Sequence, residues 1–269
     1  MIRNEGDTLK QVIVCTPRTE YYRAAELNRH NLTVPADPGT AMRQHQLLTE
    51  LLSREGAEVI DLPELPGHPN SVFTRDTAVI TPEGYIQLRM GLPTRRGEEQ
   101  WMAANLEKRD FPQLEAIKSP ATAEGGDIIL AGKVVFIGRS SRTNDAGIDQ
   151  LRPVFKRMGF EVRATDVPSP YLHIGGAMSM IAPDTVLSCR GVFPHQFFKG
   201  FRNIRVTPGD FISGNVICPG NNRVIAHAGN ENVINRLAQH GIDVQTLDLC
   251  EFVKGTGGPS CLILPVNRG

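Results

Sequence analysis

The sequence predicts an α/β fold in which five repeated units close into a ring. The first sign is a short apolar strand, a turn and a second apolar strand, a pattern that recurs five times along the 269 residues. The second is a helical stretch that ends in a glycine and leads into another strand, at Gly56, Gly159, Gly200 and Gly241. Glycine is typical of the left-handed end of a helix, where a side chain would be strained. Each unit is therefore predicted to run strand, turn, strand, helix, strand.

The strand pairs are predicted from five apolar segments that each follow a polar or glycine-rich turn. These segments open at Asp76, Glu124, His173, Gly214 and Gly258. Because few residues remain after Gly258, the fifth unit needs the first strand of the chain, residues 11–16, to be complete. We therefore expect the ring to be closed by strands from both ends of the chain.

Helices are predicted where apolar residues recur three and four positions apart. These residues are Leu47, Leu48, Leu51 and Leu52, then Ile148, Leu151, Phe155 and Met158, and finally Val233, Ile234 and Leu237. Asn144 has the side chain of a helix N-cap for the second group. A unit of this size cannot bury its own apolar faces, so we expect the sheets to pack inside and the helices outside.

The whole chain, residues 1–269, is expected to form a single domain, because no linker-like change in composition divides it. One segment departs from the repeat. Residues 17–40 are polar, rich in Pro, Ala and Asn, and without strand or helix periodicity. Long loops of this kind in compact domains are often lids, so we expect this segment to cover a binding site.

The composition argues against several classes of partner. The chain has 29 basic and 29 acidic residues, which leaves no overall field to attract nucleic acid or an anionic membrane. No apolar run suits a membrane span, and the polar amino terminus has no signal-peptide core, so a cytoplasmic location is expected. The five cysteines lack the close pairing of a zinc or dithiol motif, so neither a metal nor a disulfide framework is expected.

Four residues suited to chemistry stand at the openings of the units. They are Asp76, Glu124, His173 and Cys261. Residues at the same phase of a repeat lie on the same face, so these four are expected to share one site. Each has a structural alternative: an ion pair with Arg75 for Asp76, a turn cap for Glu124, and core positions for His173 and Cys261. The joint placement favours the functional interpretation.

The motifs around these residues make the chain similar to the guanidine-modifying enzyme superfamily. Phe73-Thr-Arg-Asp76 resembles the guanidinium-binding segment of that superfamily, and Glu124-Gly-Gly-Asp127 resembles its triad carboxylate motif. The resemblance covers essentially the whole length and is strongest to the dimethylarginine dimethylaminohydrolases, with features of the arginine deiminases. It implies a five-bladed α/β-propeller, the pentein fold.

The resemblance also implies a role for each site residue. Cys261 matches the nucleophile, His173 the general acid and base, and Glu124 the carboxylate that orients the histidine. The substrate-binding positions are occupied by Asp76, Arg95, Arg142, Asn70 and Asp127, and Asn70 stands where the dimethylarginine hydrolases usually have an acidic residue. Asp76 and Asp127 would face the guanidinium, although Asp127 can equally hold the Gly125-Gly126 turn, and Arg95 and Arg142 would hold the substrate carboxylate. The expected partner is a small guanidino compound, arginine or a methylated arginine, with no cofactor and with a second copy of the chain in a homodimer.

The expected reaction is hydrolysis of the guanidinium through a covalent cysteine intermediate, an S-alkylthiouronium. Deiminases and amidinotransferases carry an aspartate two residues after the histidine, where this chain has Gly175. That difference leaves room for an N-alkyl group and favours a methylated arginine, which would give citrulline and an alkylamine. Arginine deimination to citrulline and ammonia is the alternative. An amidinotransferase and a non-catalytic propeller that binds a partner are weaker alternatives, since fold alone does not fix function.

Overall fold

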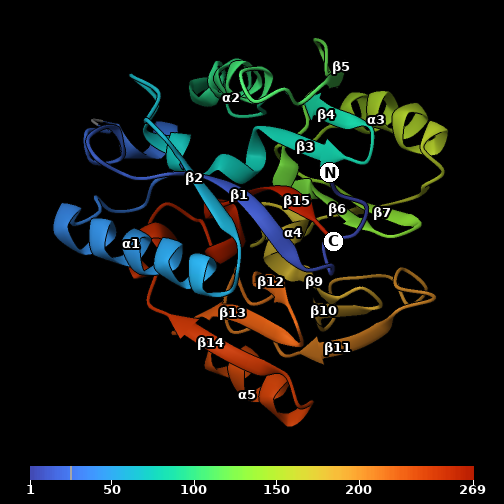
Figure 1. Cartoon of the computed structure of the whole chain (residues 1–269). Helices are drawn as coiled ribbons and strands as arrows, with labels where there is room; N and C mark the ends of the chain where they lie inside the picture. The colour runs from blue at the N-terminus through green and yellow to red at the C-terminus, as the bar shows by residue number, and fades with distance from the viewer. Residues whose placement is uncertain (25) are drawn as a thin grey trace.

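Five three-stranded sheets surround the middle of the molecule, and the longer helices lie at the periphery (Figure 1). The computed structural model describes residues 1–24 and 26–269. The strand orders are β15 (Leu264–Arg268), β1 (Leu9–Cys15), β2 (Glu58–Leu62); β3 (Ala78–Thr81), β4 (Gly84–Gln87), β5 (Gln113–Ala116); β6 (Ile128–Ala131), β7 (Val134–Arg139), β8 (Glu161–Asp166); β9 (Met178–Ala182), β10 (Thr185–Cys189), β11 (Arg202–Val206); and β12 (Ile217–Gly220), β13 (Arg223–His227), β14 (Asp243–Leu247). In every sheet the central strand is antiparallel to one neighbour and parallel to the other. The expected five-bladed α/β-propeller is confirmed.

The first sheet combines the two ends of the chain. Strand β1 runs antiparallel to β15, with Val12 opposite Pro265, and parallel to β2, with Val12 also opposite Val59. The marked termini lie next to each other in Figure 1. The core around them consists of buried aliphatic side chains such as Ile13 and Leu264, which are at most 1% exposed.

Four of the five units connect their second and third strands through a helix. These helices are α1 (Pro38–Arg54), α2 (Glu98–Glu107), α3 (Asp145–Arg157) and α5 (Glu231–Gln239). Asn144 caps α3, as its side chain accepts a hydrogen bond from the Gly147 amide at 2.8 Å. Gly56, Gly159 and Gly241 follow α1, α3 and α5 with φ of 92°, 79° and 74°. After α2 the corresponding residue is Asp110, which takes φ 60° without a glycine.

The fourth unit differs from the prediction. Between β10 and β11 the chain forms turns instead of a helix, although Gly200 still has a φ of 92°. Aromatic packing explains the difference. The rings of Phe197 and Phe198 lie 5.1 Å and 5.5 Å from that of Phe136, and a turn conformation brings both onto the sheet.

The segment 17–40 contains only short helical turns before α1 begins. These are Glu20–Tyr22 and Leu27–His30, and Ala25 lies outside the described residues. Helix α1 starts at Pro38, inside the predicted loop, because Asp37 caps it by accepting a hydrogen bond from the Thr40 amide at 2.7 Å. The loop is therefore slightly shorter than the sequence suggests.

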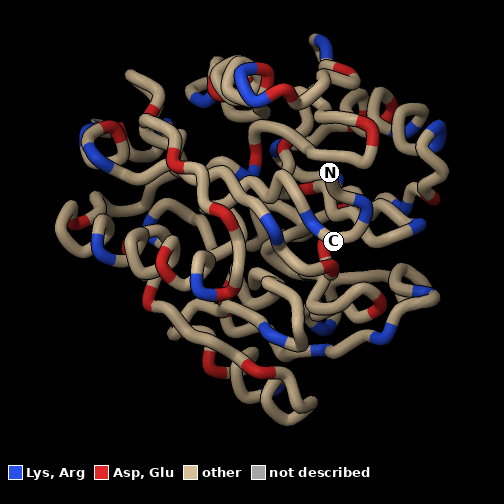
Figure 2. Tube along the Cα trace, in the orientation of Figure 1, with Lys and Arg blue, Asp and Glu red and all other residues tan. Residues whose placement is uncertain are grey.

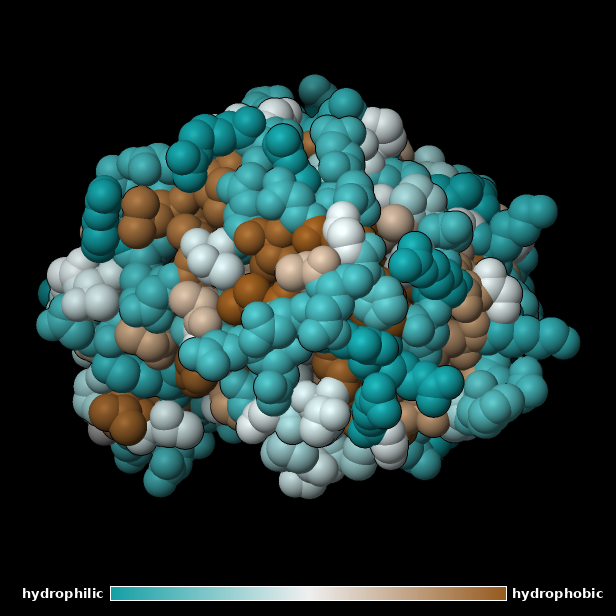
Figure 3. Space-filling view, turned by 90° about the horizontal axis from the view of Figure 1, so that it is seen from below, coloured by the Kyte–Doolittle hydropathy of each residue, from teal (hydrophilic) through white to brown (hydrophobic). Residues whose placement is uncertain are grey.

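The surface is mixed in charge and mostly hydrophilic. Basic and acidic residues are interspersed around the ring in Figure 2, and the face in Figure 3 shows hydrophobic residues mainly near the middle of the view. Within residues 1–24 and 26–269, no helix has the length and apolarity that crossing a bilayer requires.

Candidate active site

The structure brings the four predicted residues to one end of the propeller, just before the inner strands. Asp76 ends a helical turn before β3, Glu124 precedes β6, and His173 precedes the short helix α4 (Ile174–Ala177) and β9. Cys261 lies in the turn Pro259–Leu262 before β15. The common position in each unit explains why residues far apart in the sequence meet.

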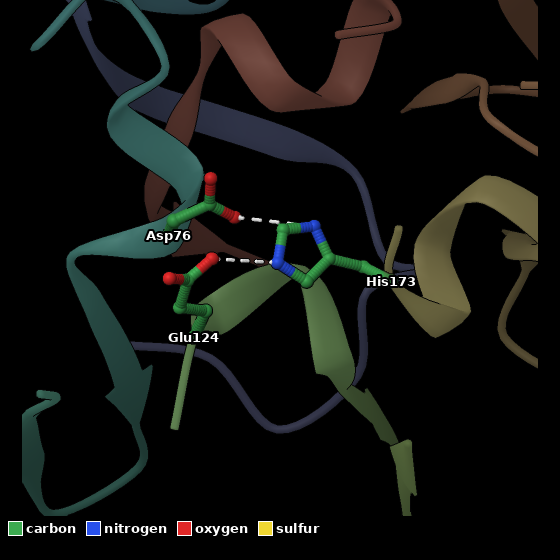
Figure 4. Close-up of side chains that lie close together, drawn as sticks. All are labelled: Asp76, Glu124 and His173. Carbon is green, nitrogen blue, oxygen red and sulfur yellow. Dashed lines mark hydrogen bonds and ion pairs between the residues drawn. The ribbon is translucent and has the colours of Figure 1, made fainter. Parts of the chain in front are cut away.

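The imidazole of His173 faces two carboxylates, those of Asp76 and Glu124 (Figure 4). Its Nε2 is 2.7 Å from Glu124 Oε2, and its Nδ1 is 3.9 Å from Asp76 Oδ1. Burial acts to lower the pKa of His173, but the charges of Asp76 and Asp127 and the hydrogen bond to Glu124 raise it to about 9. Burial acts to raise the pKa of Glu124, but the hydrogen bond and charge of His173 lower it. The imidazole is thus held in its charged form at neutral pH.

The Cys261 sulfur accepts two hydrogen bonds. The Gly258 amide donates to Sγ at 3.4 Å and Asn215 Nδ2 donates at 3.6 Å. Burial and the charge of Asp76 raise the pKa of Cys261 to about 11, whereas Gly258, Arg75 and Asn215 act to lower it. The other four cysteines are also free thiols. Cys261 lines both of the cavities that His173 also lines, whereas Cys218 lines one of them.

A polar pocket opens on one side of Cys261 and His173. Its other walls include Asn31, Asn70, Phe73, Asp76, Arg95 and Arg142. We refer to it as the polar pocket. The pocket therefore contains three of the four residues predicted to share one site, Asp76, His173 and Cys261. It also contains three of the four further residues predicted to bind substrate, Asn70, Arg95 and Arg142.

Arg95 and Arg142 both reach the polar pocket, but their contacts differ. Arg95 Nη1 donates to Asp76 Oδ2 at 2.6 Å, and its Nε donates to Glu98 Oε2 at 2.8 Å. Its Nη2 donates to the Phe73 carbonyl at 3.0 Å. For Arg142, the described residues provide one ion pair, in which Nη1 lies 3.6 Å from Glu124 Oε1. Arg142 is therefore the more available donor for a substrate carboxylate.

Asn70 offers an acceptor to the polar pocket. Its Nδ2 donates to the His30 carbonyl at 2.9 Å. Its Oδ1 is buried and has no hydrogen-bond partner among the described residues. A buried acceptor is costly to leave unpaired, so an ammonium or N–H group of a ligand would be stabilised there.

Asp127 lines neither the polar pocket nor the cavity on the other side of Cys261. Its Oδ1 accepts from the Ile174 amide at 2.9 Å and its Oδ2 accepts from Ser140 Oγ at 2.6 Å. Burial raises the pKa of Asp127 to about 6. Both carboxylate oxygens of Asp127 are therefore engaged by protein groups, and Asp127 fixes the chain directly after His173.

A second cavity lies on the other side of Cys261 and His173. It shares Leu172 and Thr256 with the polar pocket as well as these two residues. Much of its wall is apolar and includes Ile129, Met178, Met180, Phe211, Val216 and Ile263, while Glu5, Arg75 and Arg268 also line it. We refer to it as the apolar cavity. Gly175 lies in its wall, where a Cβ atom would come within 3.0 Å of the Gly126 carbonyl oxygen.

One residue of this site was not predicted. Asn215 follows the Gly214 opening of the remaining unit, so it completes the set of polar residues contributed by the five units. The repeat phase was the signal that could have identified it. A lone asparagine beside an apolar strand has no chemical signature of its own.

Asp76, Glu124 and His173 could also be considered as metal ligands, since one atom from each lies within 4.8 Å of the others. In the structure these atoms are already engaged. Glu124 and His173 share a hydrogen bond, and Asp76 accepts from Arg95 and from the Gly126 amide at 3.1 Å. The arrangement suits a protonated imidazole, and a metal ion would have to displace a proton from that ring in order to bind it.

Comparisons with known proteins point to one family. A family profile described as N,N dimethylarginine dimethylhydrolase, eukaryotic, matches residues 26–268. The dimethylarginine dimethylaminohydrolase of Pseudomonas aeruginosa is 29% identical over 231 residues, covering 85% of this chain and 89% of its own. An uncharacterised protein of Aeropyrum pernix is 32% identical over 231 residues, covering 84% of each chain.

Solved structures agree with the sequence relatives. A cysteine-to-serine variant of the Pseudomonas aeruginosa enzyme in complex with citrulline superimposes with a TM-score of 0.84 at 26% identity, covering 96% of this chain and 99% of its own. The N-terminal domain of a cyanobacterial arginine dihydrolase shares the fold, with a TM-score of 0.85 at 20% identity over 97% of this chain and 98% of its own.

Proposed function

The chain belongs to the dimethylarginine dimethylaminohydrolase family, and from this premise we propose that it converts an Nω-methylated arginine to citrulline and an alkylamine. Its class is that of an amidine-hydrolysing enzyme. The finer assignment of the substrate rests on one observation, the apolar cavity beside Cys261 and His173. The polar pocket on the other side is dominated by charged and amide side chains, where an alkyl group would displace solvent from polar groups.

The substrate fits across the two cavities. Its carboxylate would bind Arg142, its amino group would donate to Asn70 Oδ1, and its guanidinium would bind Asp76. The nitrogen that leaves must face His173, because an amide anion cannot depart without a proton. His173 lines both cavities, so the departing nitrogen can face either of them. Methyl groups on that nitrogen are better accommodated by an apolar wall, so they enter the apolar cavity.

The first chemical step forms the bond between sulfur and carbon. The negative charge of Asp76 raises the pKa of Cys261, and a bound guanidinium offsets that charge. The pKa of Cys261 is therefore lower in the complex, and the thiol proton passes to water. The thiolate attacks the guanidinium carbon and gives a tetrahedral adduct. Glu124 holds Nε2 of His173, so Nδ1 is the nitrogen that donates a proton to the departing amine as the C–N bond breaks.

The second step releases citrulline. His173, having given up its proton, accepts one from a water molecule that attacks the S-alkylthiouronium carbon. The C–S bond then breaks, the thiolate is regenerated, and the oxygen of water remains in the ureido group. The sum consumes one water and releases one amine, with no change of oxidation state.

A bulky residue in the apolar cavity tests this assignment. Ile129→Trp would fill the wall that receives the methyl groups, so we expect a much lower kcat/KM for asymmetric dimethylarginine than in wild type. Ile60→Trp is the matched control, because Ile60 is half-buried on the outer strand β2 and lines neither cavity. Equal activity of Ile129→Trp and Ile60→Trp would contradict the placement of the methyl groups.

A further inference from the structure

We propose that Asn215 is a catalytic residue, which donates a hydrogen bond to the Cys261 sulfur and thereby favours the thiolate. The role in turnover rests on the function proposed above, whereas the effect on the sulfur itself can be measured without substrate. Asn215 is 2% exposed, and its Nδ2 lies 3.6 Å from Sγ. That distance is within the range of a hydrogen bond to sulfur.

The orientation of the Asn215 amide is fixed by two backbone groups. Its Oδ1 accepts from the Ser260 amide at 2.9 Å, and its Nδ2 donates to the Gly175 carbonyl at 3.0 Å. If the amide were flipped, its N–H groups would face the Ser260 N–H and its oxygen would face the Gly175 carbonyl oxygen. The second N–H of Nδ2 is therefore the group that faces Cys261, and an N–H donor stabilises a negatively charged sulfur more than a neutral thiol.

The surroundings allow little movement of this amide. The Asn215 backbone amide donates to the Ile212 carbonyl at 2.9 Å. A Cβ atom on Gly258 would come within 2.5 Å of Asn215 Oδ1, so only glycine lets the two segments approach this closely. The Gly258 amide also donates to Sγ, and the two donors converge on one atom.

Asn215 also links the nucleophile to the general acid. Ser260 directly precedes Cys261, and Gly175 follows His173 by two positions. One side chain thus bridges the two segments that carry the reacting groups. During the reaction the sulfur loses its negative charge when the C–S bond forms and regains it when that bond breaks, so a donor at Sγ assists the release of citrulline as well as the formation of the initial thiolate.

The test is the pH dependence of alkylation of Cys261 by iodoacetamide in the free protein, read by mass spectrometry of the peptide that contains it. Asn215→Ala removes the donor, and the midpoint is expected to rise by about one pH unit. Asn215→Asp keeps the shape and the acceptor for Ser260 but has no N–H, and its midpoint is expected to rise further.

Asn230→Ala is the matched control. Asn230 is buried and donates to the same Ile212 carbonyl at 3.2 Å, but it has no contact with Cys261, so its profile should match wild type. A wild-type midpoint in folded Asn215→Ala or Asn215→Asp would overturn the proposal. Absence of hydrolysis by wild type, together with a shifted midpoint in these variants, would instead refute the proposed function and leave the contact with sulfur standing.

Discussion

Arg95 Nη1 lies 2.6 Å from Asp76 Oδ2, inside the pocket where a substrate guanidinium is expected to bind the same carboxylate. Both side chains are only 4% exposed. Arg95 also contacts Glu98, whose Oε2 lies 2.7 Å from its Nη2. Burial raises the pKa of Glu98 to about 7, although the charge of Arg95 opposes this. Arg95 thus holds two buried carboxylates together before any substrate arrives.

Replacing this arginine should affect stability more than replacing Arg142. Arg95→Met removes the ion-pair partner of Glu98 and the closer of the two cations beside Asp76, which keeps only the protonated His173 at 3.9 Å. We therefore expect a loss of about 3–5 kcal/mol in the free energy of unfolding. Arg142→Met should cost much less, because its one ion pair is 3.6 Å long, but should raise KM. Denaturant unfolding and steady-state kinetics check both. A more stable Arg95→Met than Arg142→Met would contradict the assignment.

The protonation of His173 should appear in the pH dependence of stability. Its pKa in the folded protein, about 9, lies above the ordinary value of 6.5, so the protonated form stabilises the fold. This contribution is fully present below about pH 6.5 and is lost as the pH rises through about 9. The free energy of unfolding of wild type relative to His173→Gln should therefore fall by about 1–3 kcal/mol between those limits. A constant difference would show that His173 is neutral in the fold.

Asp127 should act through His173 and leave substrate binding unchanged. Asp127→Asn is expected to keep the wild-type KM, because both carboxylate oxygens bond to protein groups. Its charge is one of those that raise the pKa of His173, so the pH profile of kcat should move to lower pH. Asp76→Asn is the comparison, and there KM should rise. A raised KM in Asp127→Asn would restore the guanidinium contact that the sequence suggested.

The sequence predicted the architecture well where a local rule decides it. The phase of the repeat placed Asp76, Glu124, His173 and Cys261 together, because equivalent positions of repeated units share a face. Glycine at a left-handed helix end marked the close of α1, α3 and α5. The same rule failed after α2, where Asp110 takes that conformation.

The rest depends on contacts that no local pattern records. The turns before β11 follow from the packing of Phe197 and Phe198 on Phe136. Arg95 was expected to hold a substrate carboxylate, and its ion pairs with Asp76 and Glu98 appear only in the structure. Asp127 carries the residue type of a guanidinium ligand, and only its distances to Ile174 and Ser140 show that its oxygens are occupied.

The segment 17–40 is predicted to close over the polar pocket when a ligand binds. Asn31 lines that pocket and its Nδ2 donates to Thr256 Oγ1 at 2.6 Å, while the Thr33 amide donates to the Lys254 carbonyl at 2.8 Å. Hydrogen exchange in this segment should slow in the presence of citrulline, and exchange in α5 should stay the same. Unchanged exchange in both would remove the lid from the account.

Product analysis distinguishes hydrolysis of a methylated arginine from deimination of arginine. Wild type and Cys261→Ser are incubated separately with asymmetric dimethylarginine and with arginine, and the products are identified by mass spectrometry. We expect citrulline and dimethylamine from the methylated substrate with wild type alone. Ammonia from arginine without dimethylamine would establish deimination instead, and equal products from Cys261→Ser would contradict the covalent mechanism.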